Sequence, residues 1–128
     1  MHRLPTLDEM HAVALDAYAS IPDEMRRFVE GVVIRIADFP DDETIDEMEL
    51  ESEYDLLGLY RGVAVGDKGS SYIAHDVDMI FLYRMPIIDY WQETGEDLQH
   101  IIRHVLIHEI GHHFGLSDDD MERIEAQS

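Results

Sequence analysis

Residues 108–118 read His-Glu-Ile-Gly-His-His-Phe-Gly-Leu-Ser-Asp, and within them His108, Glu109 and His112 form an H-E-x-x-H pattern. Residues four apart lie on the same face of a helix, so both imidazoles can reach one metal ion. The glutamate beside the first histidine can take a proton from a water molecule at that ion. The pattern therefore predicts a zinc site on a helix.

Gly115 and Asp118 extend this pattern to H-E-x-x-H-x-x-G-x-x-D. Gly115 suits the position just after a helix, where a positive φ costs glycine nothing. A turn there lets Asp118 approach the ion as third ligand. The fourth tetrahedral position is then left for water, as in catalytic zinc sites. The alternative is that Asp118 only begins the next helix, with Asp119 as the substitute ligand.

The segment that carries the pattern has strong helical periodicity. Its apolar residues recur at i, i+3, i+4 and i+7 spacing, at Leu98, Ile101, Ile102, Val105, Leu106 and Ile110. Thr94 is the expected N-cap. We therefore expect a central helix, on which Gly111 allows close packing against a neighbouring strand. The alternative is that His108 and His112 are surface histidines and Glu109 a structural carboxylate.

Three further histidines lie close to the pattern. His113 is rotated by about 100° from His112, so we expect it to cap the helix or support a ligand. His100 and His104 continue the four-residue spacing upstream, but the row drifts by about 40° per step, so four histidines cannot share one metal. We expect His104 at the edge of the site and His100 in solvent.

The other segments predict helices and strands in alternation. Thr6 and Glu9 form a capping box before a helix over residues 7–19. A short helix should follow Pro22 with Met25, Phe28 and Val29 on its inner face. We further expect a strand covered on both faces over 32–37, a short helix capped by Thr44, strands over 56–65 and 77–83, and short helices over 86–93 and from Ser117 to Ile124.

Composition limits the class of protein. The chain has 128 residues, of which 45% are hydrophobic, which suits a single domain over residues 1–128. It has no cysteine, so only His, Asp and Glu remain as strong metal ligands. Its 29 acidic and 9 basic residues give a formal charge of −20, which disfavours nucleic acid and anionic membranes as partners and favours cations and basic polypeptides. The alternative is that this charge serves solubility alone.

We expect neither a secretory signal peptide nor a membrane-spanning segment. No apolar stretch follows Met1–Thr6, so we expect no signal peptide. No run approaches the roughly 18 apolar residues that cross a bilayer. We therefore expect a cytoplasmic protein.

With these residues in view, the chain resembles the bacterial zincin-like metallopeptidase family with the minimal zincin fold. The likeness is carried in order by residues 22–36, 56–63, 80–84 and 105–116, and the H-E-x-x-H-x-x-G-x-x-D stretch is its most specific part. It covers nearly the whole chain.

The resemblance implies an α+β fold. A small mixed or antiparallel sheet of about three strands would pack against the active-site helix, with N-terminal and C-terminal helices around it. The resemblance also implies zinc held by His108, His112 and Asp118, with Glu109 as general base. In zincins an edge strand pairs with an extended substrate, a role for the strand near Val63 or near Ile80.

One departure from the zincin pattern concerns the oxyanion. The ten residues after Asp118 include no Tyr or His, the residues with which many zincins stabilise it. Met121 is expected in the core rather than in a methionine turn. Stabilisation is then expected from the metal or from upstream. The upstream candidates are Tyr60, Tyr72, Tyr83 and Tyr90.

Together these features predict a zinc-dependent hydrolase of the metallopeptidase type, acting on peptide or protein substrates of extended or basic character. The alternative is a non-catalytic or weakly active zinc-binding or protein-interaction module of the same fold, favoured by the missing downstream residue and the small size. A metal-dependent nuclease is a third reading, which the charge of −20 disfavours. Substrate, oligomeric state and the metal loaded in the cell do not follow from the sequence.

Overall fold

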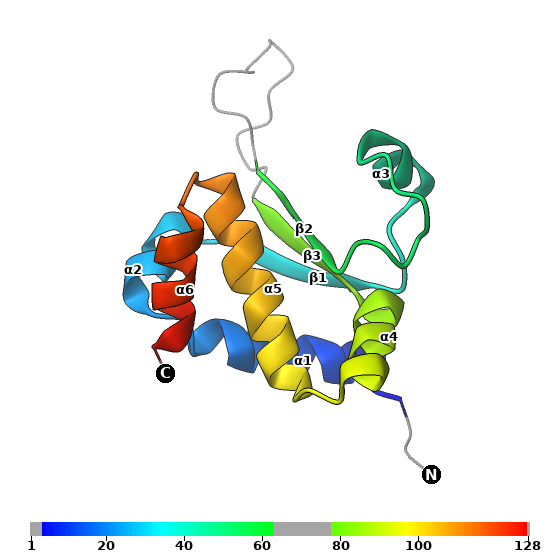
Figure 1. Cartoon of the computed structure of the whole chain (residues 1–128), viewed down its shortest axis with the longest axis horizontal. Helices are drawn as coiled ribbons and strands as arrows, with labels where there is room; N and C mark the ends of the chain where they lie inside the picture. Colours follow the sequence, from blue (N-terminus) through cyan, green and yellow to red (C-terminus); the bar gives the residue numbers. More distant parts are fainter. Residues whose placement is uncertain (1–3, 63–77, 128) are drawn as a thin grey trace.

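A computed structural model describes residues 4–62 and 78–127 of the chain. In this part the elements are α1 (Leu7–Ala19), α2 (Asp23–Arg26), the 3-10 turn η1 (Arg27–Val29), β1 (Val33–Ala37), α3 (Asp42–Glu47), β2 (Gly58–Arg61), β3 (Met79–Tyr83), α4 (Arg84–Thr94), α5 (Leu98–His113) and α6 (Asp118–Ala126). Figure 1 shows α1, α5 and α6 together on one side of the small sheet, with α3 on the other. This α and β content agrees with the minimal zincin fold that the resemblance implies.

The sheet is mixed, with strand order β1-β3-β2. β3 pairs parallel to β1 and antiparallel to β2, so both of its sides are occupied. The strand near Ile80 therefore cannot receive a substrate strand, because it is the central one. β2 ends at Arg61 and lies at an edge. Val63 itself is outside the described residues.

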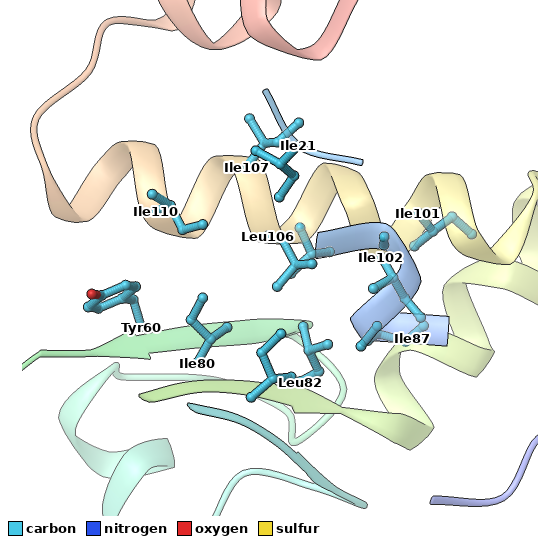
Figure 2. Packing of buried hydrophobic residues seen from close by; sticks show 14 of the residues in the cluster. Ile21, Tyr60, Ile80, Leu82, Ile87, Ile101, Ile102, Leu106, Ile107 and Ile110 are labelled. Carbon is cyan, nitrogen blue, oxygen red and sulfur yellow. The ribbon is translucent and has the colours of Figure 1, made fainter. Parts of the chain in front are cut away.

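The hydrophobic core fills the space between the sheet and α5. Ile80 and Leu82 of β3 meet Leu106 and Ile110 of α5, and all four side chains are fully buried (Figure 2). Burying a side chain of this size contributes roughly 1.5–3 kcal/mol relative to leaving it exposed. The expected central position of the α5 helix is therefore confirmed.

Strand β1 is less covered than its sequence predicts. It is an edge strand on which only Ile34 is buried, while Arg35 is exposed. Helix α1 packs on β1, and alternate residues of a strand point to opposite faces. The expectation of cover on both faces is wrong, because α1 covers only one of them.

The first helix begins and ends where the sequence places it. The Thr6 side chain accepts a hydrogen bond from the Glu9 N–H, and the Glu9 carboxylate accepts one from the Thr6 N–H, which completes the predicted capping box. After α2, the expected inner position of Phe28 is wrong. Phe28 is 47% exposed and stacks on Phe114 at a centroid distance of 5.2 Å.

Two helix starts differ from the prediction. Thr94 is not the N-cap of α5 but the last residue of α4, and Gly95 follows with φ +71°. Since α4 continues to Thr94, α5 needs a later cap, and the Asp97 side chain accepts from the His100 N–H. Helix α3 is likewise capped by Asp41 rather than by Thr44, which is buried inside it.

No helix among the described residues is long and apolar enough to cross a membrane.

Candidate metal centre

Helix α5 ends in a turn that sends the chain back along it. The Leu116 N–H donates to the Gly111 carbonyl at 2.8 Å and the Gly115 N–H to the His112 carbonyl at 3.3 Å, and Gly115 has φ +76°. These two bonds form a Schellman motif, in which the residue after the helix adopts the left-handed backbone conformation. The predicted role of Gly115 is confirmed.

Helix α6 then runs antiparallel to α5. Its start is capped by Ser117, whose hydroxyl oxygen accepts from the Asp120 N–H at 3.1 Å. Its middle meets the end of α5, where a Cβ on Gly111 would lie 2.3 Å from the Met121 Sδ. The close neighbour of Gly111 is thus a helix residue and not the strand expected from the sequence.

His108 lies between two other histidines of α5. Its ring centroid is 4.0 Å from that of His104 and 5.9 Å from that of His112. Burial, and next the nearby His104, lower the pKa of His108 from its ordinary value. The neutral imidazole that a metal ion requires is therefore the favoured form.

Glu109 lies on the side of α5 that faces β2. Its carboxylate accepts a hydrogen bond from the backbone of Tyr60, and burial raises the pKa of Glu109 despite that bond. The ring of Tyr60 stacks on His113 at a centroid distance of 4.0 Å. A Cβ on Gly62 would lie 2.6 Å from the His113 ring, so β2 and the end of α5 are in close contact. His113 thus packs against Tyr60 and Gly62, whereas the sequence predicted that it would cap the helix or support a ligand.

Alternate residues of β2 point their backbone N–H and C=O groups away from β3, toward the outer edge of the sheet. The Tyr83 N–H donates to the Leu57 carbonyl at 2.9 Å, so Leu57 and Leu59 face β3. Gly58 and Tyr60 therefore present their backbone groups away from the sheet. Glu109 meets this edge at Tyr60.

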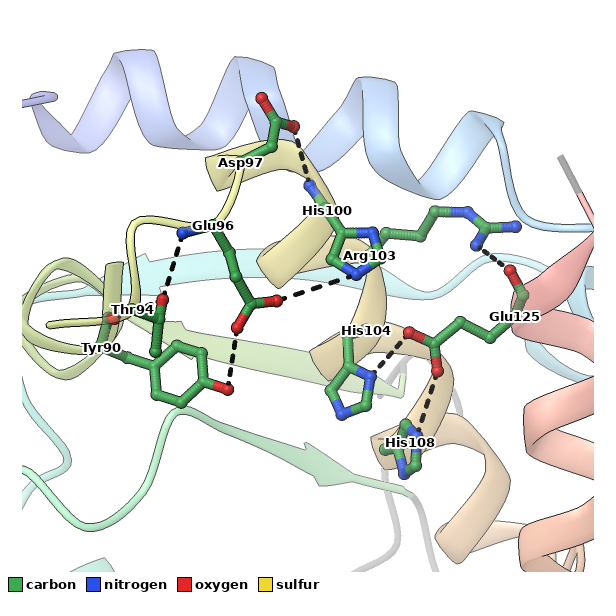
Figure 3. A network of polar contacts seen from close by, with 9 residues as sticks. All are labelled: Tyr90, Thr94, Glu96, Asp97, His100, Arg103, His104, His108 and Glu125. Atoms are coloured by element: carbon green, nitrogen blue, oxygen red, sulfur yellow. Dashed lines mark hydrogen bonds and ion pairs between the residues drawn. The ribbon is translucent and has the colours of Figure 1, made fainter. Parts of the chain in front are cut away.

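A cluster of three metal-ligating side chains lies where α6 passes α5. The Glu125 carboxylate is 2.7 Å from the His104 Nδ1 and 3.4 Å from the His108 Nε2 (Figure 3). One ligand atom from each of the three residues lies within 4.8 Å of the others, the one such group among residues 4–62 and 78–127. Burial would raise the pKa of the Glu125 carboxyl group, but the imidazoles of His104 and His108 lower it overall.

Residues 29–128 match the family model of the zincin-like metallopeptidases. The chain belongs to this family. The matched region includes all three strands and both α5 and α6. No curated protein matches the chain.

Membership of the zincin-like metallopeptidases implies a metal cofactor, usually zinc, and protein or peptide substrates. The donors present fit that metal. Histidines of α5 and carboxylates of α6 come from two helices in contact, and zinc accepts both donor types. The lowered pKa of His108, caused first by burial, favours the form that binds.

Of the three predicted zinc ligands, one belongs to the cluster. His108 belongs to the three-residue cluster, whereas His112 and Asp118 lie outside it and are exposed. His112 is one turn after His108 on α5, and Asp118 is the first residue of α6. The set of His108, His112 and Asp118 stays a prediction.

The tyrosines proposed for the oxyanion lie in different places. Tyr60 on β2 donates its hydroxyl to Asp78 at 2.6 Å, and Tyr90 on α4 donates to Glu96 at 3.3 Å. Tyr83 is buried at the end of β3. Tyr72 lies outside the described residues. Of these side chains, that of Tyr60 is in contact with the end of α5, through His113.

Glu125 was not expected near these histidines from the sequence. It lies seven positions after Asp118, or about two helical turns, so both residues occupy one face of α6. That spacing could have predicted that Glu125, like Asp118, faces α5. His104 was expected at the edge of the site, and its ring lies 4.0 Å from that of His108. His100, half exposed beside Glu96, agrees with the expected solvent position.

Proposed function

We propose that this protein is a zinc-dependent peptidase in which His108, His112 and Asp118 hold the metal and Glu109 is the general base. The family match to zincin-like metallopeptidases is the observation that carries the proposal. Zinc bound there supplies Lewis-acid chemistry, lowering the pKa of water and polarising a carbonyl group. A cytoplasmic location and a single domain over residues 1–128 belong to the same proposal.

Glu109 has the surroundings that a general base needs. Its raised pKa, caused by burial, makes the carboxylate a stronger base than an exposed one. The Tyr60 hydrogen bond orients the carboxylate, which would take the proton of the attacking water. The same carboxyl group can then return that proton to the leaving amine.

The free edge of β2 is the proposed substrate platform. An extended peptide can add to an exposed edge through backbone hydrogen bonds. Gly58 and Tyr60 are buried and the Tyr60 backbone already bonds Glu109, so the part of this edge open to a peptide begins at the exposed Arg61 and Gly62, next to the base. A peptide paired there would therefore pass close to the base. The charge of −20 favours peptides with basic residues.

Glu109→Gln is the decisive variant, because the amide keeps the size and the acceptor for the Tyr60 hydrogen bond but cannot take a proton. Zinc-loaded protein is incubated with a mixed library of basic and acidic peptides, and products are followed by mass spectrometry. We expect cleavage of basic peptides and a loss of about 100-fold or more in Glu109→Gln, in line with the worth of a general base.

Glu122→Gln is the matched control, since Glu122 is an exposed glutamate of α6. It should cleave like the unchanged protein. Equal turnover in Glu109→Gln, or no turnover by zinc-loaded protein, would contradict the peptidase proposal. The second result would leave the non-catalytic zinc-binding module as the better description.

A further inference from the structure

The cluster of His104, His108 and Glu125 is not the ligand set expected from the H-E-x-x-H pattern. Only His108 is common to the two, and Glu125 reaches the cluster from α6 (Figure 3). Two imidazoles and one carboxylate are a ligand set that zinc and other divalent first-row metals accept.

We propose that His104, His108 and Glu125 form a second divalent-metal site, which shares His108 with the predicted zinc site. The existence of this second site does not depend on peptidase activity. Its consequence does rest on the proposed function: metal in the cluster takes His108 away from His112 and Asp118, so the two sites compete.

The distances in the cluster suit a small metal ion. Zinc lies about 2.0–2.2 Å from His nitrogen and carboxylate oxygen, so neighbouring ligand atoms of a tetrahedral site are roughly 3.3–3.5 Å apart. The Glu125 carboxylate is hydrogen-bonded to the His104 Nδ1 at 2.7 Å, a bond that an ion would replace, and lies 3.4 Å from the His108 Nε2, with the ligand atoms all within 4.8 Å. Side-chain shifts of about an ångström or less would centre an ion among them, since rotamers allow such adjustments.

The backbone that carries Glu125 is held against α5. The guanidinium of Arg103 donates to the Glu125 carbonyl at 2.8 Å and to the Gln127 carbonyl at 2.7 Å. These bonds place the carboxylate beside the two imidazoles before any ion arrives, which reduces the entropy lost on binding. The cluster is also open to solvent, because 51% of the His104 side chain and 19% of the Glu125 side chain are exposed.

The two ligand sets follow each other along the contact between α5 and α6. From His104 to His112 is about 12 Å along α5, and from Asp118 to Glu125 is about 10.5 Å along α6. Since the helices are antiparallel, the spacings match: Glu125 lies at the His104 end, and Asp118 at the His112 end. His108 stands between them on α5.

The test removes the predicted zinc set and asks whether metal still binds. In His112→Ala/Asp118→Ala protein, zinc is titrated by calorimetry and cobalt by visible absorption, with circular dichroism to verify folding. We expect about one equivalent of metal to remain bound. Adding Glu125→Gln or His104→Asn should then weaken binding by about 100-fold or more, because losing a direct ligand exceeds the 10–100-fold effect of losing a supporting contact.

Glu122→Gln in the same double variant is the control, because it removes an exposed carboxylate of α6 without touching the cluster. It should leave the affinity unchanged. A folded double variant that binds no metal would overturn the proposal, and so would binding that neither Glu125→Gln nor His104→Asn weakens. The experiment measures metal binding and not peptide cleavage. Its result therefore tests the second metal site even if the protein proves not to be a peptidase.

Discussion

Gly111 of α5 and Met121 of α6 are in direct contact, and a Cβ on Gly111 would lie 2.3 Å from the Met121 Sδ and 2.7 Å from its Cγ. Met121 is fully buried, so its side chain has no solvent to move into. The absence of a side chain at position 111 therefore sets how closely α6 approaches α5. That approach in turn brings the carboxylates of α6 to the histidines of α5.

We expect Gly111→Ala to destabilise the protein by about 1 kcal/mol. Overpacking a core contact costs about 1–3 kcal/mol, whereas replacing glycine by alanine inside a helix gains up to about 1 kcal/mol. Urea denaturation followed by circular dichroism measures the difference. Gln99→Ala, an exposed change on the same helix, should cost nothing. A Gly111→Ala protein as stable as the original would show that α6 adjusts freely.

Asp118→Ala should weaken zinc binding by about 100-fold or more, because losing a direct ligand exceeds the 10–100-fold effect of losing a supporting contact. Asp119→Ala should change the affinity little. Both residues lie in the first turn of α6, so each change removes the same favourable interaction with the helix dipole. Competition with a chelator measures both affinities. The reverse ranking would make Asp119 the ligand instead.

Arg103 ties three segments together, since its guanidinium donates to the Ser20 hydroxyl at 3.0 Å and to the Glu125 and Gln127 carbonyls. Arg103→Lys keeps the charge but loses the planar fork, so we expect a loss of about 1–2 kcal/mol in unfolding free energy. Faster amide exchange in residues 121–127 should accompany it. Arg35→Lys, at an exposed position of β1, is the control and should leave exchange in α6 unchanged. Unchanged exchange in Arg103→Lys would contradict this anchoring role.

The link between α2 and α6 should weaken in acid. The Glu24 carboxylate accepts hydrogen bonds from Gln127 at 2.9 Å and Arg123 at 3.0 Å, and these bonds lower the pKa of Glu24 from its ordinary 4.5. A carboxyl group with a lower pKa in the folded state stabilises the protein above its unfolded pKa. It loses that contribution as the pH falls through its folded pKa.

Glu24→Gln measures this contribution. The difference in unfolding free energy between the original and the variant should be constant near neutral pH and should shrink below about pH 4, where carboxyl groups begin to protonate. Urea denaturation at several pH values measures it. A difference that does not change on acidification would mean that the charge of Glu24 is not what matters.

Local signals in the sequence account for most helix ends. The capping box of Thr6 and Glu9, the glycine at 115 and the serine at 117 each act through neighbours within a few residues, and the structure has all three. Thr94 is not the cap of α5, although it too is a residue type that caps helices. Its competitor Asp97 lies close by, and the choice depended on where α4 stops.

Sites that depend on distant neighbours were less accessible to prediction. Phe28 has the spacing of a core residue, but its ring stacks on Phe114 at the surface. How far β1 is buried depended on its place in the sheet, and it lies at an edge because β3 is the central strand. In both cases the decisive contacts join segments far apart in the sequence, for which periodicity carries no information.

The sequence by itself determined that His108, Glu109 and His112 share one helix and that the chain turns back after it at Gly115. It could do so because helical spacing and the φ preference of glycine act over a few residues. Only the tertiary structure decided that Glu109 meets the Tyr60 backbone and that Glu125 joins His104 and His108. Those contacts depend on how closely β2 and α6 pack on α5, and the packing follows from long-range contacts such as that of Gly111 with Met121.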